Sequence, residues 1–452
     1  YGDSALAENI IHTKDHNYFL SFDQKIGLLE CMAGVLLQDI VETFGCRLNT
    51  FESEIIKSNL LGTSERQRIV FNTCAVTAEA ERQARQAIRK ARRVNPDAEI
   101  IVTGCSAQLN PTAFENMPEV DRILGNEEKL LPHVWDNDAS PQTLVSDIMN
   151  VSEVAPQLVA GFENRVRAFV QVQQGCDHRC TFCIIPFARG NSRSIPIGKL
   201  VEQTQMLIDN GYKEIVLTGV DLTSYGSDLP GQPSLGNMVG RLLKHVPDLK
   251  RLRLSSLDPV EIDADLLKLI GNEQRLMPHL HLSIQAGDDM ILKRMKRRHL
   301  RNDVIEIAKQ LRGMRPDIVL GADLIAGFPT ETETMFKESL DLISEIELVH
   351  LHVFPYSERE GTPAAKMPQV PHAMRKTRAA ILREAGQNML HKYLKSCIGR
   401  RERVLVEKDS VGRTEHFIPM NVKNSTGPGE IINATVTSAT MTELHGSCER
   451  QS

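Results

Sequence analysis

Three cysteines in a CxxxCxxC spacing constrain this chain more than any other feature. Cys176, Cys180 and Cys183 lie in one short loop, directly after the strand-like run RAFVQVQ. A structural zinc site needs four protein ligands, whereas a 4Fe-4S cluster can take three thiolates and keep one iron open to a small molecule. The spacing therefore favours an iron–sulfur cluster that binds a cofactor or substrate. A zinc loop completed by His178 or by a distant ligand is the alternative.

Three further cysteines are spread through the first third of the chain, and each follows an apolar run. QDIVETF leads to Cys46, RIVFNT leads to Cys74 and EIIVTG leads to Cys105, with helix-like segments at 52–61 and 77–93 between them. Alternating strands and helices predict a parallel sheet, whose loops at the carboxyl ends of the strands meet at one edge. We therefore expect the three thiols to meet there, although each alone could be a small buried residue.

The same alternation resumes between residues 165 and 360. Six strand-like runs are separated by helical stretches such as 197–210 and 301–314, which predicts a partial (βα)6 barrel. After a basic helical segment, short alternating runs separated by Gly and Pro predict a small all-β domain. The predicted fold class is α/β, with an N-terminal parallel-sheet domain, a central partial barrel and a C-terminal small all-β domain.

Composition narrows the function classes. Nine cysteines behind an N-terminus without a secretory pattern favour reduced thiols that bind metal over disulfides. No apolar run reaches membrane-spanning length, so we expect a cytoplasmic protein with no membrane partner. The formal charge of −5 gives no global reason to expect nucleic acid, so RNA contacts would need local basic patches. Cys31, Cys397 and Cys448 are expected to be small buried or incidental thiols.

From residue 38 onward, this combination resembles the radical S-adenosylmethionine methylthiotransferases along nearly the whole chain. The sequences TFGCRLNTFESE, QGCDHRCTFCIIPFARGNSRS, LTGVDLTSYG and HLHLSIQAG are similar to those of the threonylcarbamoyladenosine tRNA methylthiotransferase family. Relatives that act on isopentenyladenosine tend to read CQMN at the first cysteine, and those that act on a ribosomal protein tend to read CxKN. Here the same four residues read CRLN.

The resemblance implies two 4Fe-4S clusters and S-adenosylmethionine as cofactors. One cluster would be held by the CxxxCxxC cysteines and an auxiliary one by the dispersed set; the six implied ligands are Cys46, Cys74, Cys105, Cys176, Cys180 and Cys183. The cofactor would serve twice, once to methylate sulfur and once to make the radical that takes hydrogen from carbon 2 of the adenine. No acid–base side chain is assigned, because none could deprotonate that carbon at neutral pH.

Further expectations concern the cofactor and the partners. Ser255 and Gln285 end two barrel strands and are predicted to contact S-adenosylmethionine, with ordinary turn chemistry as the alternative. The expected partners are the tRNA substrate, a reductant protein such as flavodoxin or ferredoxin, and a sulfur donor. Basic runs that could meet tRNA phosphates lie at 82–93, 293–301 and 375–395.

The predicted domain boundaries follow from the same patterns. They are an N-terminal extension at 1–34, in which Met32 would be a natural start, a methylthiotransferase domain with the auxiliary cluster at 35–150, a radical S-adenosylmethionine barrel at 160–370, a basic helical linker at 371–398 and a TRAM-like β domain at 399–452. The TRAM-like domain carries seven basic and seven acidic residues and one aromatic residue, Phe417. Its balance of charge gives it no net attraction for phosphates, and Phe417 is the one aromatic side chain there that could stack on a base.

Two kinds of alternative function remain at the level of sequence. The first is the same chemistry on isopentenyladenosine in tRNA or on a ribosomal protein side chain. The second is a two-cluster electron carrier without catalysis. A carrier has no use for open irons, and ferredoxin-like ligation uses four cysteines per cluster, so the sequence favours an enzyme.

Overall fold

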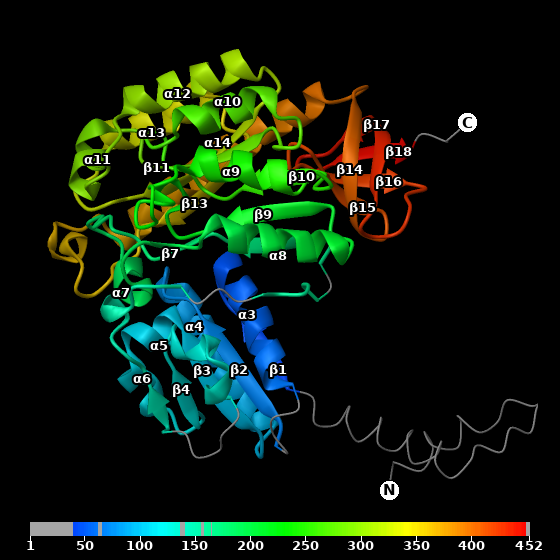
Figure 1. Ribbon diagram of the computed structural model, residues 1–452. Coiled ribbons are helices and arrows are strands. Elements are labelled where there is room, and N and C mark those ends of the chain that lie inside the picture. The colour runs from blue at the N-terminus through cyan, green and yellow to red at the C-terminus, as the bar shows by residue number, and fades with distance from the viewer. Residues whose placement is uncertain (1–38, 62–65, 136–140, 155–157, 164, 449–452) are drawn as a thin grey trace, which may run out of the picture.

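A computed structural model describes residues 39–61, 66–135, 141–154, 158–163 and 165–448 of the chain, in three parts (Figure 1). The predicted extension at 1–34 and Cys31 lie outside these residues. The three parts are a parallel sheet, a larger barrel and a small β domain, so the predicted fold class is confirmed. No helix in the described ranges is long and apolar enough to cross a lipid bilayer.

The N-terminal sheet has five parallel strands in chain order. They are β1 (Ile40–Thr43), β2 (Arg68–Thr73), β3 (Glu99–Gly104), β4 (Arg122–Leu124) and β5 (Thr143–Leu144). The helices between them are α3 (Arg47–Leu60), α4 (Ala78–Val94), α5 (Cys105–Leu109) and α6 (Pro111–Glu115). The Thr77 hydroxyl accepts a hydrogen bond from the backbone N–H of Ala80 and caps α4, as its position predicts. Helix α3 begins five residues before the predicted start, directly after Cys46.

The barrel consists of six parallel strands with helices outside them. The strands are β6 (Arg167–Gln171), β9 (Glu214–Thr218), β10 (Arg251–Leu254), β11 (His279–Gln285), β12 (Val319–Ala326) and β13 (His350–Pro355). They pair in the orders β6-β9-β10 and β11-β12-β13, and a bridge between Leu257 and Leu282 joins the two groups. The outer helices are α8 (Ile197–Asp209), α9 (Leu235–His245), α10 (Ala264–Asn272), α11 (Asp289–Met295), α12 (Arg301–Met314) and α13 (Glu333–Glu345). All six predicted strands are confirmed.

A short segment after β6 carries the cysteine loop. It comprises β7 (Gln173–Gln174), the loop itself, α7 (Ile185–Arg189) and β8 (Arg193–Ser194). Helix α3 packs on the barrel, since its Phe51 and Ile55 share one apolar core with strand β6 and the outer helices. The parallel sheet and the barrel are therefore a packed pair rather than separate bodies on a linker.

The C-terminal part is one long helix and a closed five-stranded barrel. The helix is α14 (His372–Ser396), and the strands are β14 (Arg401–Lys408), β15 (Val411–Thr414), β16 (Pro419–Lys423), β17 (Ile431–Ala439) and β18 (Leu444–Cys448). Cys397 is buried in its core and Cys448 packs against that core, as expected for incidental thiols. Phe417 stacks on His279 of β11 with ring centroids 5.5 Å apart, so it joins the two barrels rather than presenting a free ring to RNA.

The structure corrects the prediction that the start of α14 meets tRNA phosphates. Arg375 and Arg378 are buried. The Arg375 guanidinium donates to the carbonyl oxygens of Val370 and Tyr356, and Arg378 forms a 2.8 Å ion pair with Glu331. These charges hold the helix against the barrel. Of the basic residues at 375–378, only Lys376 is exposed and available to a phosphate.

Candidate cluster and cofactor site

The three N-terminal cysteines lie at one edge of the sheet, as the strand pattern predicts. Cys46 follows β1 and precedes α3, Cys74 follows β2, and Cys105 begins α5 after β3. Gly45 has a left-handed φ of +97°, and a Cβ atom there would lie 2.6 Å from the Cβ of Cys74. Only glycine lets the backbone before Cys46 come this close to Cys74.

The surroundings of these thiols combine burial with hydrogen-bond donors to sulfur. Burial raises the pKa of Cys74 to about 11, and the neighbouring Cys105 and Cys46 add to the shift. The backbone N–H of Val76 donates to Cys74 Sγ at 3.5 Å, and the Asn126 side chain donates to Cys105 Sγ at 3.8 Å. Free thiols would stay protonated here, so binding of a metal would have to displace protons.

The second cysteine set occupies the loop between β7 and α7. Gly175, which precedes Cys176, has a φ of +72°, and a Cβ atom there would lie 1.9 Å from the carbonyl oxygen of Asn191. Thr181 anchors the middle of the loop, because its hydroxyl donates to the carbonyl of Arg294 at 2.7 Å and its N–H donates to that of Met295. The loop is therefore held against the end of α11.

Charged side chains surround the loop. Arg297 Nη1 lies 3.7 Å from Cys180 Sγ, and Arg297 Nη2 donates to Asp258 Oδ2 at 2.7 Å. His178 Nε2 lies 3.0 Å from Asp221 Oδ2 and 3.4 Å from Glu261 Oε1. Hydrogen bonds to these two carboxylates raise the pKa of His178 to about 10. The ligand atoms of His178, Asp221 and Glu261 lie within 4.8 Å of one another, and His178 directs Nε2 to these two carboxylates.

Both sets fit a 4Fe-4S cluster with three protein ligands. Each offers three cysteines without a disulfide, a hydrogen-bond donor to sulfur, and one arginine that offsets thiolate charge. The remaining described cysteines lie in or beside the core of the C-terminal domain and cannot serve as a fourth ligand. The six ligand assignments themselves stay predictions.

A buried polar network joins the two sets, and its centre is Arg189 at the end of α7. The guanidinium donates to Glu52 Oε1 at 2.7 Å and to Asn49 Oδ1 at 2.5 Å, both on α3. Lys129 donates to the other oxygen of Glu52 at 2.7 Å. Burial opposes ionisation of Glu52, but Arg189 and Lys129 outweigh it and lower the pKa to about 2. Arg189 also lies near Cys105 and Cys46 and donates to Gln174 Oε1 at 2.9 Å, so it links the N-terminal cysteine set to the strand before the cysteine loop.

We expect Arg189→Met to destabilise the packing of the sheet on the barrel by about 3–5 kcal/mol, because it leaves a buried carboxylate short of a partner. The measurement is the urea midpoint of the holoenzyme together with its iron content. Lys199→Met removes an exposed ion pair on α8 and should cost less than about 1 kcal/mol. Equal midpoints for the two variants would contradict this role of Arg189.

The two predicted cofactor contacts lie where the sequence placed them. Ser255 follows β10 and Gln285 ends β11, and both are half-buried at the carboxyl ends of the barrel strands. Gln285 has a left-handed φ of 73°, a strained conformation for glutamine and one that is enriched at functional sites. No described contact tests a cofactor role for either residue, so both stay predictions.

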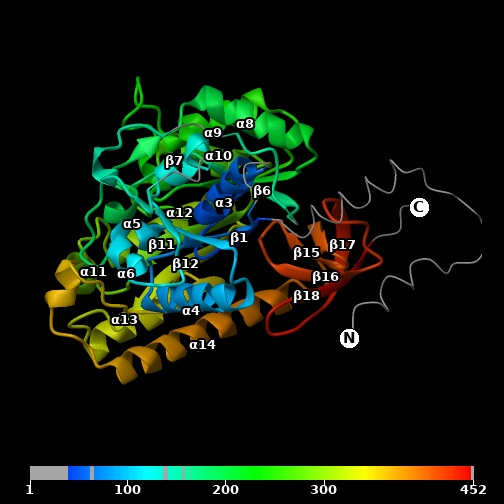
Figure 2. The same ribbon diagram turned by 90° about the horizontal axis from the view of Figure 1, so that it is seen from below.

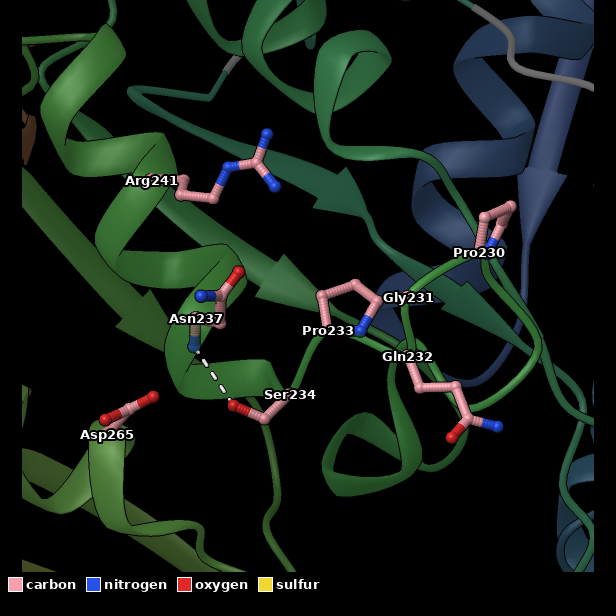
Figure 3. A pocket seen from close by; sticks show the side chains of 8 residues that line it. All are labelled: Pro230, Gly231, Gln232, Pro233, Ser234, Asn237, Arg241 and Asp265. Atoms are coloured by element: carbon pink, nitrogen blue, oxygen red, sulfur yellow. Dashed lines mark hydrogen bonds between the residues drawn. The ribbon is translucent and has the colours of Figure 1, made fainter.

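A separate pocket of about 360 Å³ lies at the start of α9 and is lined by residues 230–234 and by Asn237, Arg241 and Asp265. Figure 3 shows how these side chains lie. Its polar lining includes Ser234, whose hydroxyl accepts from the backbone N–H of Asn237 and so caps the helix. The pocket has no cysteine among its lining residues. We assign it no function.

A barrel with this cysteine loop, packed on a cysteine-bearing sheet, defines a radical S-adenosylmethionine protein with an added domain. In agreement, the family model described as "Radical SAM superfamily" matches residues 170–343, and "Uncharacterized protein family UPF0004" matches residues 38–125. The radical S-adenosylmethionine family implies a 4Fe-4S cluster and S-adenosylmethionine as cofactors.

Curated relatives specify the family further. The chain is 57% identical to "Threonylcarbamoyladenosine tRNA methylthiotransferase MtaB" of Rickettsia prowazekii, over 89% of this chain and 95% of the relative. It is 35% identical to the protein of the same name from Aquifex aeolicus, over 87% and 99%. It is 33% identical to "tRNA-2-methylthio-N(6)-dimethylallyladenosine synthase" of Lawsonia intracellularis, over 82% and 87%. The chain belongs to the threonylcarbamoyladenosine tRNA methylthiotransferase family.

Proposed function

We propose that this protein is the enzyme that attaches a methylthio group to carbon 2 of N6-threonylcarbamoyladenosine beside the anticodon of tRNA. The observation that carries the proposal is that two three-cysteine sets lie on packed domains, which one buried arginine, Arg189, ties together through α3 and β7. Radical chemistry suits this reaction, because the C–H bond at carbon 2 is too weakly acidic for a side-chain base. The higher identity to the threonylcarbamoyladenosine relatives than to the dimethylallyladenosine relative favours this substrate.

The residues take distinct roles in this proposal. Cys176, Cys180 and Cys183 hold the cluster that binds S-adenosylmethionine, and the dispersed cysteines hold the auxiliary cluster. When bound, these cofactors supply a 5′-deoxyadenosyl radical and the sulfur that is transferred. Arg189 fixes the two cysteine sets relative to each other through Glu52 and Asn49. A reductant protein such as flavodoxin or ferredoxin and a sulfur donor complete the reaction in the cytoplasm.

Nucleoside analysis of a deletion strain tests the substrate. Total tRNA from the strain should lack 2-methylthio-N6-threonylcarbamoyladenosine and retain N6-threonylcarbamoyladenosine when measured by mass spectrometry. A plasmid with the intact gene should restore the product, and one that encodes Cys176→Ala should not. An unchanged amount of product in the deletion strain, or selective loss of a methylthiolated isopentenyladenosine, would refute the proposal.

The outer face of α4 is the surface that we propose for the tRNA backbone. It lies on the side of the molecule seen in Figure 2 and borders a hollow of about 610 Å³ that is lined mainly by cationic side chains. Arg89, Lys90 and Arg93 are exposed there. The run at 293–301 is less available, because Arg297 pairs with Asp258 and Arg301 pairs with Glu338 and Glu345.

Replacing Arg89, Lys90 and Arg93 together with Gln should weaken tRNA binding and flatten its salt dependence. Each lost phosphate contact lowers the slope of log K against log salt by about 1. Binding across a salt series is the measurement. Lys199, Lys268 and Lys309 are similarly exposed on outer barrel helices, so their triple Gln variant is the charge-matched control. If both variants keep the slope of the unmodified protein, the tRNA lies elsewhere.

A further inference from the structure

The first residue of α3, Arg47, places a cation close to charged residues on the barrel strands. In the described part of the chain, the Arg47 side chain makes no hydrogen bond and no ion pair. Its guanidinium is close enough to Arg167, Arg253, Glu214 and Asp323 to feel their charges, and these four residues lie on barrel strands. Arg47 therefore reaches from the sheet domain into the barrel. A half-buried guanidinium has five hydrogen-bond donors and no acceptor. It therefore needs hydrogen-bond partners, which an anionic ligand would supply.

The region that Arg47 enters carries an excess of positive charge. Glu214 pairs with Arg167 at 2.8 Å, with Arg253 at 2.9 Å and with Arg251 at 3.5 Å. A second carboxylate, Glu407, is shared between Arg167 and an arginine of the β domain. With Arg47 and the nearby Asp323 included, five arginines lie beside three carboxylates. This imbalance favours an anion near Arg47.

A group of polar side chains on the neighbouring strands completes the surroundings. His281 Nε2 donates to Asp323 Oδ1 at 2.9 Å, and His352 Nδ1 donates to the same oxygen at 3.2 Å. In the described ranges, the second ring nitrogen of each histidine has no hydrogen-bond partner, and 62% of the His352 side chain is exposed. The group can therefore offer hydrogen bonds to a polar ligand that enters from solvent.

We propose that Arg47, with the His281–Asp323–His352 group near it, binds the carboxylate-bearing N6 substituent of the target adenosine and so selects this substrate. The inference rests on the proposed function and adds the residues that recognise the base. The threonylcarbamoyl group carries one carboxylate, and a guanidinium fork matches a carboxylate with two parallel hydrogen bonds. Position supports the match, because Arg47 directly follows Cys46, and carbon 2 and the carbon that bears N6 flank the same ring nitrogen of adenine.

The test compares two anticodon stem-loop RNAs that differ at one group. One carries N6-threonylcarbamoyladenosine and the other carries its methyl ester, which keeps the shape and removes the charge. Binding to the holoenzyme with both clusters is measured at fixed salt. We expect the free acid to bind at least about 30-fold more tightly than the ester, and Arg47→Gln to bind both RNAs equally. Equal binding of acid and ester by the unmodified protein would overturn the inference.

Variants separate this inference from its alternatives. Arg47→Lys keeps the positive charge but loses the two parallel donors of the guanidinium, so it should retain part of the preference for the free acid over the ester. This variant keeps the test valid if Arg47→Gln does not fold. Lys57→Gln removes a cation from the other end of α3 and should keep the full preference. 5′-Deoxyadenosine formation without RNA should persist in Lys57→Gln, which shows that a charge change on α3 does not by itself disturb the cofactor site. If the unmodified holoenzyme distinguishes acid from ester but makes no methylthio product, the proposed function fails while the binding site stands.

Discussion

Replacing Cys176, Cys180 and Cys183 together with Ala should halve the iron of the anaerobically purified protein and abolish cleavage of S-adenosylmethionine. Two sets of three thiolates predict about eight irons in two 4Fe-4S clusters, and this change removes every protein ligand of one cluster. The auxiliary set lies on a different domain, so its iron should remain. Iron analysis and quantification of 5′-deoxyadenosine are the measurements.

Cys397→Ala is the matched control for this triple variant. Cys397 is also a cysteine, but it is buried in the core of the C-terminal domain, away from both sets. Its replacement should leave about eight irons and normal cofactor cleavage. Full iron content in the triple variant would show that the loop cysteines are not cluster ligands.

The second large effect is expected from variants of the N-terminal cysteines, which are predicted to hold the auxiliary cluster. In Cys74→Ala, and likewise in Cys105→Ala, we expect 5′-deoxyadenosine to form while no methylthio product appears. The physical reason is that these thiols belong to the sheet, whereas the loop that holds the radical cluster is anchored on the barrel by Thr181. Cofactor cleavage and sulfur transfer should therefore separate. Parallel assays of 5′-deoxyadenosine and of modified nucleoside measure the two steps.

A structural role would give a different pattern in these variants. If Cys74 only filled a buried space at the end of β2, Cys74→Ala would keep the auxiliary iron and would methylthiolate tRNA normally. That outcome would reduce the N-terminal set to structural residues. Loss of both activities would point instead to a sheet that no longer packs on the barrel. We expect Arg189→Met to weaken the same packing, so it serves as the comparison for that outcome.

The sequence predicted the positions of the cysteines because strand alternation is a local signal. Apolar runs ending in Cys46, Cys74 and Cys105 become parallel strands, and parallel strands bring their carboxyl ends together whatever the intervening sequence is. Gly45 and Gly175 carry a further local signal. A glycine directly before a cysteine marks a backbone that must come close to another chain segment, as both positions do here.

The sequence could not predict the partners of charged residues. Arg189 looks like one basic residue in a polar run, and its partner Glu52 lies 137 positions earlier in the chain. Arg378 likewise reads as a cation of a basic helix, although Glu331 on another segment neutralises it. Whether a charge is buried and paired depends on tertiary packing, which leaves no periodic trace in one sequence. For the same reason, only the folded chain shows that the Arg47 side chain has no hydrogen bond or ion pair among the described residues.

The central claim is that the two cysteine sets act together on carbon 2 of one adenine. The most direct measurement uses the reconstituted holoenzyme, a reductant, S-adenosylmethionine and an anticodon stem-loop RNA whose N6-threonylcarbamoyladenosine carries deuterium at carbon 2. We predict that one deuterium appears in 5′-deoxyadenosine for each RNA that gains a methylthio group and loses its label. 5′-Deoxyadenosine without deuterium, together with RNA that keeps its label and gains no sulfur, would contradict the account.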